Sequence, residues 1–190
     1  FIKKCHSAVC LFTARAERWS IKMKTYKPEG RIISTEENKK YLSGACYLRE
    51  AYHGGTILEG RVVRCDAEHN LHVDLGCMKG VIPRSEGALG IEDGSVRDIA
   101  LISRVNKPVV FVITGFESDE NGETYAVLSR RNVQEECMNE YVSTLTAGDI
   151  IPATVTHMEG FGVFCDIGCG ISALMPIDSI SVSRIPHPSA

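Results

Sequence analysis

Residues 148–180 read GDIIPATVTHMEGFGVFCDIGCGISALMPIDSI, and this stretch decides the fold. It contains three short apolar runs separated by glycine-bearing turns: 151–155, 163–167 and 171–177. Runs of this length and spacing predict three strands of an antiparallel meander. Phe161 and Phe164 lie three positions apart beside a glycine bend, an arrangement suited to stacking on nucleic-acid bases. The stretch therefore predicts a small sheet that carries an aromatic pair.

A second copy of this pattern lies upstream. The sequence VDLGC at 73–77 corresponds to CDIGC at 165–169, 92 positions later. Repeats at this spacing, each a small β unit with a leading helix, indicate tandem domains rather than one fused core. Asp74 and Asp166 occupy equivalent positions in the two copies, so we interpret them as turn-shaping residues and not as a catalytic pair.

The first copy is predicted to hold five strands. The run 109–116 is the strongest because it is almost entirely β-branched and aromatic, and Asn121-Gly122 favours a hairpin after it. Residues 99–105 could be extended or a short helix. The predicted strands are 56–64, 71–75, 80–83, 109–116 and 125–129.

One helix is predicted in front of each copy. The first covers about residues 35–52, with Ser34 as N-cap and Glu37 three residues later. The second begins at Asn132, whose third following residue is again a glutamate, and ends before Gly148. Both are expected to pack an apolar face on neighbouring strands.

Composition is ordinary for a globular protein, with 44% hydrophobic and 24% charged residues. The net charge of −3 is uneven: residues 1–54 carry +6, residues 55–147 carry −6 and residues 148–190 carry −3. The two β regions are therefore acidic. Nucleic-acid binding through a broad basic patch is excluded, and binding would have to rest on stacking and shape.

Eight cysteines show no CxxC motif and no paired Cys/His spacing, so no metal site is predicted. Scattered thiols favour a reducing compartment, and we expect a cytoplasmic protein. The sequence contains no nucleophile elbow and no phosphate-binding loop. We therefore expect neither a cofactor nor an enzymatic activity.

The N-terminal residues resemble a truncated signal peptide, but the apolar run 8–14 is short and is followed by Arg15. Met23 is a plausible natural start, so residues 1–22 are interpreted as a non-native or disordered leader. The rest divides into a lead-in and helix at 23–54, a first barrel at 55–131, a linker helix at 132–147 and a second repeat at 148–190.

Residues 148–177 resemble the S1 motif, an RNA-binding repeat typical of the bacterial ribosomal protein S1 family. The shared pattern is a glycine, a strand, a bend with two phenylalanines and an Asp-apolar-Gly strand end, and the exit Leu128-Ser129-Arg130-Arg131 resembles the family's inter-repeat junctions. The resemblance covers about residues 55–190. It implies a mainly β fold of tandem OB-type five-stranded antiparallel barrels, each preceded by an α-helix, whose strand-two and strand-three face holds single-stranded nucleic acid. The second barrel is expected to be incomplete after its third strand, with the native chain continuing beyond Ala190.

The first repeat departs from the family pattern. His69 and His72 stand where the family has aromatic residues, Pro83 replaces a histidine, and Glu123 stands where a cation is expected. Imidazole stacks on bases less broadly than phenylalanine. We therefore expect the first repeat to bind RNA weakly, or to be a docking surface for protein.

The resemblance predicts an RNA-binding protein of the translation apparatus, similar to the N-terminal part of ribosomal protein S1, that binds single-stranded messenger RNA at the small ribosomal subunit. Its partners would be that RNA and small-subunit proteins, with no membrane involved. The alternative is an accessory RNA-binding module of a larger RNA-processing or metabolic enzyme. The candidate RNA-contacting residues are Phe161, Phe164, His157, Arg184, His69, His72, Arg130 and Arg131.

Overall fold

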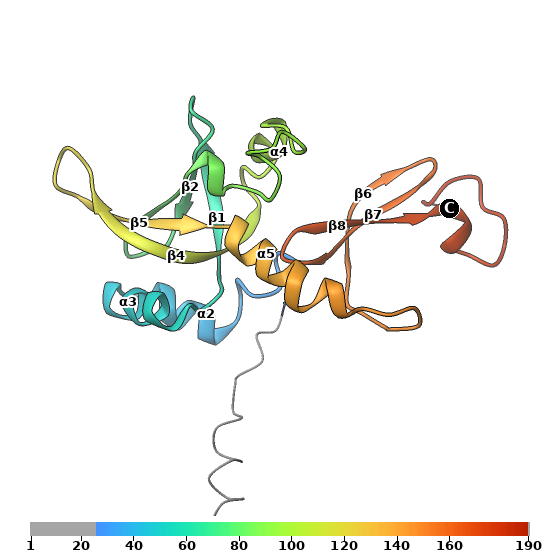
Figure 1. The fold of residues 1–190 in the computed structure, drawn as a ribbon, viewed down its shortest axis with the longest axis horizontal. Coiled ribbons are helices and arrows are strands. Elements are labelled where there is room, and N and C mark those ends of the chain that lie inside the picture. The colour runs from blue at the N-terminus through green and yellow to red at the C-terminus, as the bar shows by residue number, and fades with distance from the viewer. Residues whose placement is uncertain (1–25, 190) are drawn as a thin grey trace, which may run out of the picture.

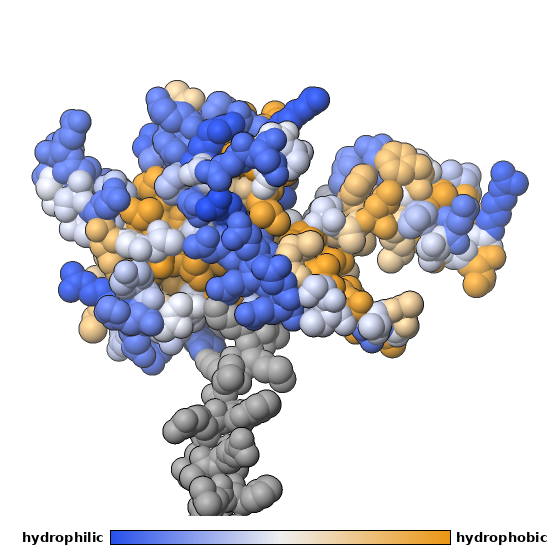
Figure 2. Space-filling model, viewed as in Figure 1, coloured by the Kyte–Doolittle hydropathy of each residue, from blue (hydrophilic) through white to orange (hydrophobic). Residues whose placement is uncertain are grey.

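The computed structural model describes residues 26–189, so the leader predicted at residues 1–22 lies outside the described residues. Figure 1 shows a barrel and a separate sheet side by side, with helix α5 (Arg131–Glu140) between them. The space-filling view shows the second sheet extending from the barrel as its own lobe (Figure 2). The fold is mainly β, as the sequence predicts.

Five strands close the first barrel in the order β1-β2-β3-β5-β4. Four of the pairings are antiparallel, but β3 and β5 pair in parallel, which differs from a wholly antiparallel barrel. Parallel neighbours need a long connection, and the chain between β3 and β5, which includes helix α4 (Ile99–Ile102) and strand β4, supplies it. The strands are β1 (Leu58–Cys65), β2 (Leu71–Asp74), β3 (Lys79–Ile82), β4 (Pro108–Ser118) and β5 (Thr124–Ser129).

Strand β4 is buried on both faces. Val109, Phe111 and Ile113 point into the barrel core, whereas Val110 and Val112 pack in a second cluster under α5. Five consecutive buried residues, 109–113, result from this double cover. Strand β4, which has the strongest β propensity, therefore packs in the barrel core with one face and in the cluster under α5 with the other.

The helices differ from the prediction in their boundaries. The single helix expected over 35–52 is two helices, α2 (Glu36–Leu42) and α3 (Ala45–Gly54), because the chain turns at Ser43-Gly44. Thr35, not Ser34, is the N-cap of α2 and accepts a hydrogen bond from the backbone of Asn38.

Residues after the barrel also form shorter helices than predicted. The segment expected over 132–147 is α5 followed by a 3₁₀ turn, η3 (Val142–Thr144), and α5 begins one residue before Asn132. The open alternative for 99–105 is resolved in favour of a short helix, α4, which is preceded in the chain by the 3₁₀ turn η2 (Arg84–Glu86).

The second repeat is an open three-stranded antiparallel sheet in the order β6-β7-β8, followed by η4 (Ile177–Ser179). Its strands are β6 (Thr154–Glu159), β7 (Gly162–Gly168) and β8 (Ile171–Pro176). The first strand begins three residues later than predicted, after Pro152, which has no N–H to donate to a ladder. No helix among residues 26–189 is long and apolar enough to cross a membrane.

Candidate nucleic-acid interface

One surface of the second sheet carries a row of rings. His157 of β6 lies opposite Phe164 of β7, and Phe164 lies opposite Leu174 of β8. Phe161 stands in the turn just before β7. We call these four residues the second-repeat face: His157, Phe161, Phe164 and Leu174.

The three rings contact one another. The His157 and Phe164 rings are stacked with centroids 6.3 Å apart and an interplanar angle of 26°. Phe161 meets Phe164 edge-on, at 6.1 Å and 88°. Phe161 is 58% exposed, Phe164 is half-buried, and His157 is exposed with its Nε2 2.6 Å from Glu159 Oε1. The sheet therefore presents aromatic surface to solvent on a fixed support.

Two local features of the sequence put these rings together. A β-bulge between Val155 and His157 shifts the register so that His157 faces Phe164. Gly162 lets β8 approach, since a Cβ there would lie 2.5 Å from the Met175 carbonyl oxygen. A simple alternation of faces along β6 does not reveal the bulge. The sequence therefore predicted the pair Phe161 and Phe164 more directly than His157 beside them.

The first barrel carries the matching surface with different chemistry. Arg64 lies opposite His72, and His72 lies opposite Val81, after a bulge between Val62 and Arg64. Arg64 and His157 are 93 positions apart, and His72 and Phe164 are 92 apart. The row of the first barrel, together with His69 in the turn before β2, is the first-repeat face: Arg64, His69, His72 and Val81.

A carboxylate fixes the central imidazole of the first-repeat face. His72 Nε2 lies 3.1 Å from Asp66 Oδ2, and Asp66 also accepts hydrogen bonds from the backbone and side-chain nitrogens of Asn70 at 2.7 and 3.0 Å. Burial alone would raise the pKa of Asp66, but the hydrogen bonds from Asn70 and His72 lower it. His69 adopts a left-handed backbone at φ 65° in the same turn.

The first-repeat face is flanked by cations that the charge count did not reveal. Arg61 and Lys79 are exposed in the next row along the strands, on either side of Asp74, and Arg64 is exposed within the face. Three of the cations of an acidic barrel thus lie on one surface. The signal was present in β1, but the bulge after Val62 moves Arg64 to the side that strict alternation assigns to the interior.

The three remaining candidates are the arginines Arg130, Arg131 and Arg184, and none of them belongs to either row of paired residues. Arg130 is 2% exposed, with its Nε 2.7 Å from Glu29 Oε1 and its Nη1 3.2 Å from the Gly87 carbonyl oxygen. A guanidinium enclosed in this way has no exposed surface that a phosphate could contact.

Arg131 is partly exposed but is paired with Glu86 at 2.9 Å and Glu92 at 2.6 Å. Arg184 is exposed in the irregular segment after η4, and within residues 26–189 no hydrogen bond or ion pair joins it to the rings.

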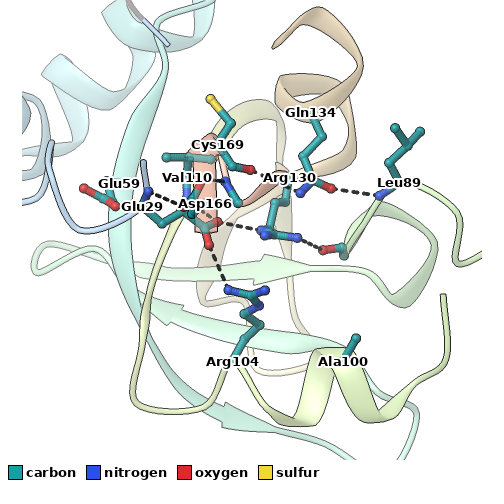
Figure 3. Close-up of polar contacts among 12 residues, drawn as sticks. Glu29, Glu59, Leu89, Ala100, Arg104, Val110, Arg130, Gln134, Asp166 and Cys169 are labelled. Atoms are coloured by element: carbon teal, nitrogen blue, oxygen red, sulfur yellow. Dashed lines mark hydrogen bonds and ion pairs between the residues drawn. The ribbon is translucent and has the colours of Figure 1, made fainter. Parts of the chain in front are cut away.

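A buried charged cluster was not predicted from the sequence. Glu29 lies between two arginines, Arg130 and Arg104, and its backbone nitrogen donates to Asp166 (Figure 3). Burial raises the pKa of Asp166, and the hydrogen bonds that it accepts lower it by less. Burial also lowers the pKa of Arg104, with the neighbouring Arg130 adding to the effect. No local pattern around Glu29 signals these partners, which lie 75 to 137 positions away.

The shared spacing of the repeats is reflected in two turns, and no metal site accompanies them in the part of the chain that the structure describes. Residues 26–189 contain no group of three or more His, Cys, Asp or Glu placed to hold a metal ion. Asp74 and Asp166 shape their own turns as predicted, accepting hydrogen bonds from Gly76 and Gly168 at 2.8 and 2.9 Å.

Comparison with known proteins agrees with the repeat pattern. The chain is 28% identical over 135 residues to small ribosomal subunit protein bS1 of Leuconostoc lactis, covering 71% of this chain and 30% of that protein. It is 29% identical over 173 residues to the bS1 homolog of Bacillus cereus, covering 85% and 42%. The chain thus spans less than half the length of these relatives.

No protein-family profile matches the chain. The solution structure of GSP13 from Bacillus subtilis matches with a TM-score of 0.33 at 22% identity over 52% of this chain and 64% of that chain, a likeness too loose to carry an argument. The chain is therefore similar in sequence to bacterial ribosomal protein bS1, and its first repeat is a closed five-stranded, OB-like barrel.

Proposed function

We propose that this chain binds single-stranded RNA through its S1-type repeats, with unpaired bases stacking on the second-repeat face. The observation that carries the proposal is the contacting row of His157, Phe164 and Phe161 on an exposed sheet surface. Rings held in this way accept any base because every base has a flat π surface. The resemblance to bS1 supports the same conclusion.

The first-repeat face would add a weaker contact of a different kind. Arg64, with Arg61 beside it, can meet phosphates, whereas Lys79 is already paired with Glu123 at 2.7 Å. His72 can stack or donate a hydrogen bond. Few cations are involved, so the affinity should depend only mildly on salt. We further propose that the RNA is messenger RNA and that binding takes place at the small ribosomal subunit, where the relatives' name places them.

Phe161→Ala tests the stacking contact. Fluorescence anisotropy with a short unstructured RNA should show a loss of affinity of about tenfold, since stacking on one base is worth about 1–3 kcal/mol. Phe161 is the right target because its ring is exposed and because, unlike His157 and Phe164, it lies outside the strands, so its loss should leave the sheet intact.

Tyr47→Ala is the matched control. Tyr47 is an aromatic residue of α3, 40% exposed, whose ring contacts Lys40 and neither face. It should bind RNA like the unaltered chain. Equal affinities of Phe161→Ala and Tyr47→Ala would overturn the proposed function.

A further inference from the structure

The segment 26–33, which we call the strap, connects the two repeats. On the side of the first repeat, Glu29 Oε1 accepts from Arg130 Nε at 2.7 Å and Oε2 accepts from Arg104 Nη1 at 3.0 Å. Glu59 of β1, which is fully buried, accepts hydrogen bonds from the backbone nitrogens of Gly30, Ile32 and Ile33. The strap is thus fixed to the barrel by two carboxylates. One is that of Glu29 in the strap, and the other is that of Glu59 in β1.

The same segment is bound to the second repeat. The backbone nitrogen of Cys169 donates to the Lys27 carbonyl oxygen at 2.9 Å. The backbone nitrogen of Glu29 donates to Asp166 Oδ2 at 2.8 Å, while Asp166 Oδ1 holds its own turn. One residue, Glu29, therefore binds the first repeat with its side chain and the second repeat with its main chain (Figure 3).

Comparison of the two copies shows that this contact is more than turn chemistry. Asp74 is exposed and bonds the backbone of its own turn at Gly76. Asp166, at the equivalent position, is 4% exposed and reaches across to Glu29. A turn residue does not need burial, and burial raises its pKa, which costs stability. In the second copy, Asp166 lowers the stability in this way at the contact between the two repeats.

Helix α5 supports the contact from the other side. Gln134 accepts from the backbone nitrogen of Leu89 in the first repeat at 2.9 Å and donates to the Cys169 carbonyl oxygen at 3.1 Å. Tyr26, Cys137 and Cys169 pack in one apolar cluster with residues of β4. Charge, hydrogen bonds and apolar burial thus all meet where the strap passes.

From this geometry we infer that Glu29 and the strap hold the first-repeat and second-repeat faces in one fixed arrangement, so that a single RNA strand binds both at once. The inference rests on the proposed function. In a fixed arrangement, the second face stays at a set distance from an RNA that already occupies the first face. The effective concentration of the second face near that RNA is therefore raised. Glu29 is then a positioning residue for RNA that touches no RNA itself.

RNA length separates this role from a merely structural one. A single OB-type site holds about 4–16 nucleotides, so an RNA of about 5 nucleotides occupies one face and one of about 25 reaches both. Unaltered protein should bind the longer RNA more tightly than two independent faces would. Glu29→Gln should bind the short RNA unchanged and lose about tenfold or more in affinity for the long RNA.

Two further variants complete the test. Glu86→Gln is the matched control, since Glu86 pairs with Ser129 and Arg131 within the first repeat and its junction, and it should bind both RNAs normally. If circular dichroism shows that Glu29→Gln is unfolded, Gln134→Ala loosens the same contact more mildly and should show the same selective loss.

The outcomes are distinguishable. Equal loss on both RNAs, no loss on either, or no advantage of the long RNA in the unaltered protein would overturn the inference while leaving stacking intact. Insensitivity of short-RNA binding to Phe161→Ala would instead overturn the proposed function.

Discussion

Gly170 lies at the tightest point between the repeats. Its φ is +75°, and a Cβ there would collide with Arg130 Nη2 and come within 2.7 Å of Glu29 Oε2. Gly170→Ala should therefore lower the free energy of unfolding by about 2–3 kcal/mol, combining backbone strain with displacement of a buried ion pair. Chemical denaturation of the full chain measures this.

Gly122→Ala isolates the backbone part of that cost. Gly122 has a φ of +79° in the β4–β5 turn, and a Cβ there would have nothing within 4 Å. Its substitution should cost about 1 kcal/mol. If both variants lose the same amount, the close packing at Gly170 contributes nothing.

At the scale of single residues, local sequence predicts local chemistry and no more. The turn roles of Asp74 and Asp166 followed from their position before a glycine, and both are confirmed. The burial of Asp166 and Arg130 could not be predicted, because their shared partner, Glu29, is 137 and 101 positions distant in the chain. Arg130 looked like a phosphate ligand since no local pattern distinguishes a buried arginine from an exposed one.

At the scale of strands, the sequence predicted a strand at each place where the structure has one in the two repeats. For β4 the signal was its β-branched and aromatic residues, because this strand is buried on both faces. What escaped the prediction were the bulges, which add a residue without a sequence signal and change which side chains share a face. The contact between the two phenylalanine rings depends on no bulge. Arg64 and His157 each follow a bulge, and Arg64 was not among the residues predicted from the sequence.

Arg64 should contribute one phosphate contact. Arg64→Ala should weaken RNA binding at low salt and reduce the slope of log affinity against log salt by about 0.7, the value for one contact to a single strand. Arg97→Ala is the control, because Arg97 is exposed in the β3–β4 connection, outside both faces, and carries the same charge. Anisotropy titrations at several salt concentrations compare the two slopes. Identical slopes for the two variants would remove Arg64 from the interface.

At the scale of the whole molecule, the strap makes the two repeats depend on each other. The repeat spacing predicted tandem units, and the barrel and the open sheet follow that division. The contacts between them come from α5 and from residues 26–33, and the sequence marked residues 26–33 only as an extended lead-in. A segment without secondary structure carries no periodicity, so its role is visible only once its partners are placed.

Removal of the strap should therefore destabilise the first repeat as well as the contact between repeats. A chain starting at Ser34 lacks Glu29, so Arg130 is left buried without the carboxylate that pairs with it. The shortened chain also lacks the backbone N–H groups of Ile32 and Ile33, which donate hydrogen bonds to Glu59. Breaking a buried ion pair costs about 3–5 kcal/mol, so the unfolding midpoint should fall sharply below that of a chain starting at Met23. A synthetic peptide of residues 23–35 added to the shortened chain should restore the midpoint, because it returns both carboxylate contacts. Equal midpoints for the two chains, or a peptide without effect, would show that the strap is not what joins the repeats.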